Sequence, residues 1–270
     1  MDGVFYSVAT PIGNLADITL RACDVLRSVD LILCEDTRNT SVLAEKYNFT
    51  APLKSYHKFN ETERSVEILD FIKNGKNVAL VTDAGTPCIS DPGSILIEQL
   101  LQNGIKVVPI SGACAVVTFL SALPREKEEF TFIGFLPRKN GELKEIFEKY
   151  NFSNTVFYES PKRLVDTLQV LTEFCPNKKL AIGRELTKKF EEIMVDTAQN
   201  LLEYFSKNPP KGEIVGMLYA TLQENNFNEQ EIVLQINKLK AQKFSNKDIA
   251  TILSTLFDVK KNDIYSLCIR

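Results

Sequence analysis

The sequence predicts an α/β protein that consists of two α/β domains followed by a helical tail. Short apolar, β-branched runs alternate with segments of helical periodicity, a pattern typical of a largely parallel sheet covered by helices. The alternation pauses at a polar stretch that begins with proline, residues 124–129, and then starts again. With 270 residues, 44% of them hydrophobic, the chain is long enough for two buried cores.

The first domain is predicted to span residues 1–123. Its apolar runs predict strands buried on both faces at 4–8, 29–34, 77–81 and 105–109. Apolar residues at i, i+3 and i+4 predict helices at 18–29, 61–74, 91–103 and 114–123. Thr62 and Ser94 are expected start signals, and Gly75 and Gly104 are expected stop signals.

The second domain is predicted to span residues 124–225, with strands of mixed direction. Its strands are expected at 129–135, 154–160, 178–185 and 212–219, and its helices at 140–150, 161–174 and 197–207. Residues 226–270 are predicted to form a helical extension. The stretch 228–270 carries seven Lys or Arg against five Asp or Glu. Helix packing and contact with RNA both explain that slight excess, and we favour packing.

Composition excludes several classes of protein. The N-terminal residues lack a basic, then apolar, secretory pattern, and no apolar run approaches the roughly 20 residues of a membrane span. We therefore expect a cytoplasmic protein without a membrane partner. The six cysteines are scattered and His57 is the single histidine, so we expect neither a disulfide scaffold nor a metal site. A formal net charge of −3 argues against a protein that coats nucleic acid.

Three loops that follow predicted strands are candidates for a ligand site. They are Ala9–Leu15, Thr82–Gly93 and Pro109–Ala115, all rich in glycine, proline or small residues. In open α/β sheets the ligand crevice lies beyond the carboxyl ends of the strands. Alternative interpretations remain for two of them. Asp91 also suits a cap for the helix that follows it, and the small residues of the third loop also suit tight helix packing.

Charged clusters follow other strands. Residues 34–38, 158–163 and 184–189 place carboxylates beside basic groups, which suits binding of phosphates. Surface ion pairs explain each single residue equally well.

Taken in order, these stretches resemble the tetrapyrrole methylase family. The matching segments are VATPIGNLADITLRA (8–22), CEDTR (34–38), LVTDAGTPCISDPG (80–93), GFLPRK (134–139), TVFYESPKRL (155–164), GRELTKKFEE (183–192) and KKNDIY (260–265). The resemblance implies S-adenosylmethionine as methyl donor, a ligand cleft between the two domains and a homodimer. It is strongest to the branch that methylates the ribose 2′-hydroxyl of a cytidine in 16S rRNA of the small ribosomal subunit.

The resemblance also implies which residues contact the donor. These are Ile12, Gly13, Asp83, Ala84, Gly85, Thr86, Pro87, Ile89, Cys114, Ala115, Leu186 and Met217. We further hypothesise that Asp36 or Glu185 orients or deprotonates the substrate hydroxyl. Basic side chains in the matching segments are expected to bind RNA phosphates: Arg38, Lys162, Arg163, Arg184 and Lys188.

The chain departs from the family pattern at two places. Residues 109–115 lack two prolines and a serine that are usual there, which predicts a weaker donor site, and Lys162 replaces a histidine. Two rival functions stay open. One is a methylase of the same fold acting on a corrinoid or porphyrin precursor, and the other is a non-catalytic RNA-binding assembly factor.

Overall fold

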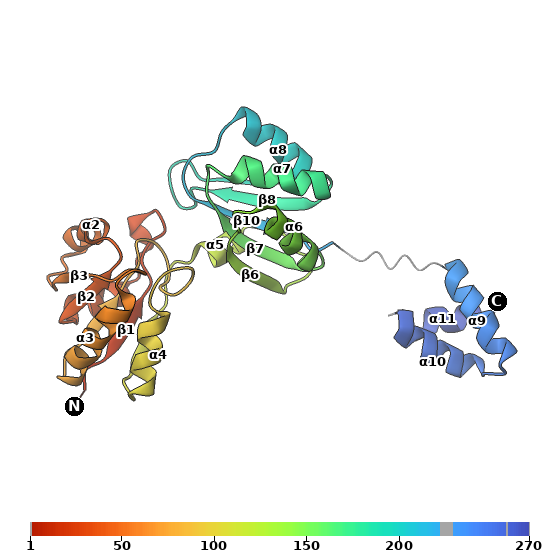
Figure 1. Cartoon of the computed structure of the whole chain (residues 1–270), viewed down its shortest axis with the longest axis horizontal. Coiled ribbons are helices and arrows are strands. Elements are labelled where there is room, and N and C mark those ends of the chain that lie inside the picture. The colour runs from red at the N-terminus through yellow and green to blue at the C-terminus, as the bar shows by residue number, and fades with distance from the viewer. Residues whose placement is uncertain (1, 222–228, 258, 270) are drawn as a thin grey trace. The chain divides into compact units, whose positions relative to one another are not determined.

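The chain divides into two compact units in the computed structural model. The model describes residues 2–221, 229–257 and 259–269. One unit is Met1–Ala220 and the other is Thr221–Arg270, and each is described by itself (Figure 1). Both predicted α/β domains lie in the first unit, and the boundary predicted at residue 123 falls in a connection between two elements of that unit. The boundary predicted at 225 lies outside the described residues.

The first sheet is parallel throughout. Its strands are β1 (Phe5–Val8), β2 (Leu31–Cys34), β3 (Leu53–Ser55), β4 (Val78–Leu80) and β5 (Val107–Ile110). They are ordered β3-β2-β4-β1-β5, and every neighbouring pair is parallel. The four predicted strands are confirmed. Strand β3 was not predicted, because its three half-buried residues include Lys54 and carry no apolar run.

Helices cover both faces of this sheet. They are α1 (Leu20–Ser28), α2 (Thr37–Tyr47), α3 (Glu61–Lys73) and α4 (Ser94–Gln102); a short 3-10 turn at Leu15–Asp17 precedes α1, and α5 (Ala115–Ser121) follows β5. Side chains of α1 and α2 share one core cluster with Ile32 and Ala79. Side chains of α3 and α4 share a second core cluster with Leu33 and Val78. Leu33 follows Ile32 in β2, and Val78 precedes Ala79 in β4. Successive strand residues point to opposite faces, so the sheet is buried on both.

The structure corrects the helix start predicted at Thr62 and confirms the one predicted at Ser94. Helix α3 begins at Glu61 after Asn60, so Thr62 lies inside its first turn. Helix α4 begins at Ser94 after Gly93, and no side chain caps it. The interpretation of Asp91 as the cap of this helix is therefore wrong. Gly93 has a φ of 134°, and this turn separates Asp91 from the helix.

The second sheet has mixed strand directions, as expected. Its strands are β6 (Phe130–Phe135), β7 (Asn154–Glu159), β8 (Lys179–Arg184), β9 (Glu192–Thr197) and β10 (Ile214–Leu218), ordered β6-β7-β10-β8-β9. Only β6 and β7 are parallel; the other neighbouring pairs are antiparallel. Helices α6 (Asn140–Lys149), α7 (Leu164–Phe174) and α8 (Ala198–Lys207) supply its main core. Strand β9 was not predicted.

Helix α5 links the two sheets of this unit. Phe119 of α5 is fully buried in a cluster with Val156 and Val215 of the second sheet and with Ile12 of the first loop. A Cβ on Gly183 would lie 2.7 Å from the Phe119 ring, so glycine permits this close approach. The shared core fixes the loops of the first sheet against the second.

The C-terminal unit contains α9 (Glu229–Ala241), α10 (Asn246–Phe257) and α11 (Lys261–Ile269). Its core is built from buried apolar side chains of all three helices, among them Ile236, Ile249 and Ile264. The prediction of a helical tail is confirmed for its described residues. Among the helices that the structure describes, none combines the length and apolar character needed to cross a bilayer.

Candidate functional site

The three glycine- and proline-containing loops meet at the carboxyl ends of β1, β4 and β5. Thr10 and Gly85 exchange backbone hydrogen bonds of 2.9 and 3.1 Å, which join the first loop to the second. The Thr86 hydroxyl donates to the carbonyl of Ala113 at 3.0 Å and joins the second loop to the third. A Cβ on Gly112 would lie 2.9 Å from the Cβ of Ala9, so the third loop also packs on the first. The loops form one connected wall.

A cavity of about 380 Å³ lies against this wall. That volume falls in the range of small-molecule sites, roughly 300–1,000 Å³. The first sheet's side of the cavity is lined by Ile12, Asp83, Ala84, Gly85, Thr86, Ile89, Ser90, Asp91, Cys114 and Ala115. The second sheet's side is lined by Phe135, Tyr158, Glu159, Ser160, Pro161, Leu186, Gly212, Glu213, Ile214 and Val215. The cavity therefore lies between the two predicted domains.

Nine of the twelve residues expected to contact the donor line this cavity; Gly13, Pro87 and Met217 do not. A Cβ on Gly13 would meet the side chain of Lys188 at 2.5 Å, so this glycine permits close packing of the first loop on the loop after β8. Pro87 is buried, and Met217 lies fully buried in the core of β10. The structure gives these three residues packing roles beside the cavity.

The loop between Cys88 and Gly93 has an unusual backbone. Cys88 and Ser90 have φ values of 68° and 70°, in the left-handed region that side chains rarely adopt. The amide of Gly93 donates to the carboxylate of buried Glu61 at 2.9 Å. Backbone strain of this kind persists only where surrounding contacts hold it. The loop thereby presents Asp91 to the cavity.

Three carboxyl groups lie near one another at this edge of the sheet: Glu35, Asp83 and Asp91. Burial, followed by the charges of Glu35 and Asp83, raises the pKa of Asp91 to about 7. Burial and the charge of Asp83 also raise the pKa of Glu35. Among the described residues, no cluster of three or more His, Cys, Asp or Glu is arranged to hold a metal ion. At neutral pH, Asp91 is therefore balanced between its two protonation states.

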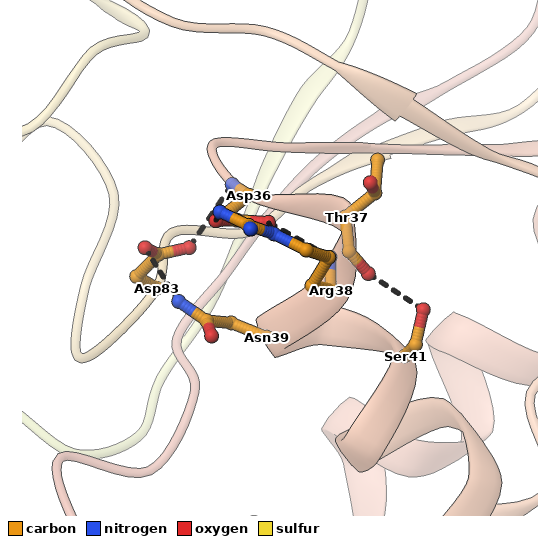
Figure 2. A network of polar contacts seen from close by, with 6 residues as sticks. All are labelled: Asp36, Thr37, Arg38, Asn39, Ser41 and Asp83. Atoms are coloured by element: carbon orange, nitrogen blue, oxygen red, sulfur yellow. Dashed lines mark hydrogen bonds and ion pairs between the residues drawn. The ribbon is translucent and has the colours of Figure 1, made fainter.

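Asp83 is held in place by the segment that follows β2. It accepts hydrogen bonds from the backbone amide of Asp36 at 3.1 Å and from the side-chain amide of Asn39 at 2.9 Å (Figure 2). The Asp36 carboxylate caps α2 and accepts two hydrogen bonds from the guanidinium of Arg38, at 3.1 and 2.7 Å. These contacts with Arg38 lower the pKa of Asp36 to about 2.

The two carboxylates hypothesised to act on the substrate hydroxyl thus sit in ion pairs. Lys188 bonds to Glu185 at 2.9 Å, and this contact lowers the pKa of Glu185. A carboxylate with a lowered pKa is a weak proton acceptor at neutral pH. The geometry favours a role in orienting neighbouring groups over deprotonation for Asp36 and Glu185, and neither residue lines the cavity.

The five basic residues expected to contact RNA differ in their surroundings. The side chain of Arg38 is 89% exposed, and Lys162 is exposed. Arg163, in contrast, donates to the buried Glu159 carboxylate at 2.8 Å. Arg184 pairs with Glu192, and Lys188 pairs with both Glu185 and Glu213. Arg38 and Lys162 are therefore the two best placed to meet a phosphate.

Several cavity residues were not singled out as ligands from the sequence. Phe135 and Tyr158 form an edge-to-face pair with ring centroids 5.4 Å apart. Both lie in the segments GFLPRK and TVFYESPKRL, which carry the family resemblance, so a signal existed for them. Glu213 had none, because it lies at the start of the predicted strand 212–219, just before β10 begins at Ile214.

The cavity residues fit the donor that the resemblance implies. The apolar side chains of Ile12, Ala115 and Leu186 suit an adenine ring, and the loop backbone supplies hydrogen-bonding groups close to it. The carboxyl groups of Asp83 and Asp91 suit a positively charged group. Gly85, with a φ of 86°, lines the cavity without a side chain.

The fold and the cavity together define an α/β protein with two sheets and a cavity of small-molecule size between them. Diphthine synthase matches over 80% of this chain and 89% of its own, with a TM-score of 0.66 and 14% identity. Uroporphyrin-III C-methyl transferase from Thermus thermophilus, solved with S-adenyl homocysteine, matches over 80% and 97%, with a TM-score of 0.56 and 17% identity. These likenesses concern the fold.

The sequence comparisons show the family. Residues 4–202 match the model of the Tetrapyrrole (Corrin/Porphyrin) Methylases. A relative from Haemophilus influenzae, named Ribosomal RNA small subunit methyltransferase I, is 38% identical over 98% of this chain and 96% of its own length. The chain belongs to the tetrapyrrole methylase family, and it is a methyltransferase.

Proposed function

We propose that this chain transfers a methyl group from S-adenosylmethionine to the ribose 2′-hydroxyl of a cytidine in 16S rRNA of the small ribosomal subunit. The observation that carries the proposal is the nearly full-length similarity to the relative named Ribosomal RNA small subunit methyltransferase I. The cavity supports it, because its loops meet at the carboxyl edge of a parallel sheet.

The chain's own residues bind and orient the reactants. When bound, the donor supplies a methyl group on a positively charged sulfur. The connected loops around Ile12, Gly85 and Ala115 hold it by backbone and apolar contacts. The pairs Asp36–Arg38 and Glu185–Lys188 orient charged groups beside the cavity. Alignment of the hydroxyl with the methyl group alone lowers the barrier by several kcal/mol, up to roughly 7–11 in well-oriented systems.

An RNA substrate meets exposed cations and an exposed aromatic ring near the cavity. Arg38 supplies an exposed guanidinium that is paired with Asp36, and Lys162 supplies an exposed ammonium group. Phe135 lines the cavity and is 62% exposed. Sequence-specific RNA recognition uses unstacked bases that lie against such rings. We therefore assign the RNA phosphates to Arg38 and Lys162, and the target base to Phe135.

The proposal extends to a homodimer located in the cytoplasm. The first statement rests on the family resemblance, and the second is consistent with the proposed rRNA substrate. Light scattering on the purified full chain checks the first, and a mass of 30.5 kDa, that of one chain, would contradict it.

Mapping of ribose methylation tests the proposed activity. Small-subunit rRNA from cells with and without this protein is digested and analysed by mass spectrometry. We expect one cytidine to lose its 2′-O-methyl group without the protein and to regain it when purified protein and S-adenosylmethionine are added. Unchanged rRNA would contradict the proposal. Methylation of a corrinoid or porphyrin precursor, or donor binding that is absent altogether, would instead support one of the rival functions.

Truncation of Phe135 tests the placement of the base. Stacking of a base on an aromatic ring contributes roughly 1–3 kcal/mol. Phe135→Ala is therefore expected to raise the KM for RNA by about 10-fold or more, with donor affinity unchanged. The matched control is Phe130→Ala, because Phe130 begins the same strand, is 45% exposed and lies outside the cavity. Equal effects of the two substitutions would contradict the assignment.

A further inference from the structure

We infer that Asp91 is the general base that takes the proton of the substrate hydroxyl during methyl transfer. This inference rests on the proposed function and deepens it, since it names a catalytic residue for the same cavity. It replaces neither Asp36 nor Glu185 as orienting groups. The inference is carried by three observations: where Asp91 lies, what holds it there and which charges surround it.

Asp91 lies in the cavity wall itself. It lines the cavity together with Ile89 and Ser90 of its own loop, and its charge influences Tyr158 on the opposite, second-sheet side. Asp36 and Glu185 lie outside the lining. A general base must come within hydrogen-bonding reach of the proton that it takes, so position is the first requirement.

The loop that carries Asp91 is held from several sides. Glu61 accepts a hydrogen bond from Gly93, and the same carboxylate accepts one from the hydroxyl of buried Tyr56 at 3.2 Å. A Cβ on Gly134 of β6 would lie 3.4 Å from the Ser90 hydroxyl, so the loop also lies close to the second sheet. The residue is not used as a helix cap. These contacts hold the strained turn that carries Asp91, and none of them is made by the Asp91 side chain.

The charges that face Asp91 leave it able to gain or lose a proton near neutrality. Glu35 follows β2 and Asp83 follows β4, and burial together with these two groups raises the pKa of Asp91 to about 7. Tyr158 faces it from β7, Cys88 lies on its own loop, and Glu159 and Glu213 line the same cavity. Glu159 and Glu213 are each paired with a basic side chain. A base whose pKa lies near the working pH combines sufficient ionisation with sufficient proton affinity.

The step is balanced in atoms and charge. The ribose oxygen forms a bond to the methyl carbon while the carbon–sulfur bond breaks, and its electron pair stays on sulfur. The proton of the hydroxyl passes to the Asp91 carboxylate. The products are the methylated ribose, S-adenosylhomocysteine and a protonated Asp91, which returns its proton to solvent before the next turnover.

Two substitutions at this position test the inference in single-turnover reactions with saturating donor and small-subunit rRNA. Asp91→Asn keeps the shape of the side chain and removes the base, and we expect the rate to fall by roughly 10²–10⁴-fold. In the unsubstituted protein the rate should rise with pH through about 7, and Asp91→Asn should lose this dependence. Asp91→Glu should recover part of the rate. A rate within threefold of the unsubstituted protein, or an unchanged pH profile, overturns the inference.

A binding measurement adds a readout that does not depend on activity. At pH 7 Asp91 is about half protonated, and a sulfonium cation beside it favours the ionised form. Calorimetry in two buffers of different ionisation enthalpy should therefore show release of about half a proton per S-adenosylmethionine bound. The neutral S-adenosylhomocysteine should release less, and Asp91→Asn should release none. Equal proton release with and without Asp91 overturns the inference.

The variant must be shown to be folded. The pKa of Asp91 is raised on folding, so the ionised side chain destabilises the folded chain, and stability is lost as pH rises through about 7. Asp91→Asn should consequently melt at a temperature equal to or above that of the unsubstituted protein at pH 8. A variant that is folded but no longer binds donor would make Asp91 a donor ligand and overturn its role as base. If the unsubstituted protein does not methylate rRNA, the proposed function fails, while proton release on donor binding still reports on Asp91.

Discussion

Replacement of Gly85 by valine is expected to weaken donor binding by at least about 100-fold. Gly85 has a φ of 86°, which costs an L-residue roughly 1–2 kcal/mol and a β-branched residue more. A Cβ there would lie 3.4 Å from Ile12 Cγ2, so a valine side chain fills the space beside a residue that lines the cavity. Calorimetry with S-adenosylhomocysteine measures the loss.

The physical reason is that Gly85 joins two of the three loops. Its amide and carbonyl both bond to Thr10 across an isolated antiparallel bridge. A shift of backbone at this bridge therefore moves the first loop as well as the second. The valine side chain takes up space beside the cavity, and the backbone shift moves the first loop. Both changes weaken donor binding, so we expect a large loss of affinity.

Gly104 provides a matched control for the energetic cost of a side chain at a residue with positive φ. Its φ is 72°, and a Cβ added there would meet nothing within 4 Å. It lies in the turn after α4, outside the cavity. Gly104→Val should lower stability by about 1–2 kcal/mol and leave donor affinity unchanged. If Gly104→Val weakens donor binding as much as Gly85→Val does, general destabilisation explains both and the local account is wrong.

Replacement of Arg163 by methionine is expected to destabilise the first unit by about 3–5 kcal/mol. Arg163 donates to the Glu159 carboxylate at 2.8 Å and to the carbonyls of Leu136 and Pro137 at 2.8 and 2.9 Å. The Glu159 side chain is fully buried, so the substitution leaves a buried carboxylate without its cation. The Thr167 hydroxyl and the Ser160 backbone amide also donate to this carboxylate, at 2.7 and 2.6 Å, but neither supplies a positive charge. Urea denaturation followed by circular dichroism measures the change.

The neighbouring residue separates stability from RNA binding. Lys162 is exposed, so Lys162→Met should change the free energy of unfolding by less than about 0.5 kcal/mol. It should weaken RNA binding and reduce its salt dependence, because one phosphate contact is lost. The reverse outcome, in which Arg163→Met weakens RNA binding but not folding, would place Arg163 at the RNA as the sequence predicts.

Local pattern accounts for which elements were predicted and which were missed. The strands β2 and β4 are continuous apolar runs that are fully buried, because both faces of a parallel sheet are covered, whereas β1 and the edge strand β5 are only partly buried. Helix α2 was missed, since only Thr40 and Leu43 among its residues are buried and its apolar stripe is weak. Strand β9 was missed because its residues are mostly half-buried. An edge strand is stabilised by pairing with its neighbour, which local sequence does not reveal.

The sequence also predicted part of the candidate site. The three loops were found because parallel strands place their carboxyl ends at one edge, so loops that follow them converge. The family prediction is confirmed by the matching family model and the relatives. Asp91 was expected to cap a helix, and that expectation failed because the helix begins two residues beyond Pro92.

The order of residues by itself determined the two α/β halves, the helical tail, the family and the loops that surround the cavity. These follow from apolar periodicity and from turn residues, which act over a few neighbouring positions. Only the tertiary structure decided which charges are available for chemistry. Lys188 meets Glu213 from a distant part of the chain, and Glu35 and Asp83 approach Asp91 from other strands. Electrostatic energy depends on separation and burial in space, and neither can be read from separation along the chain.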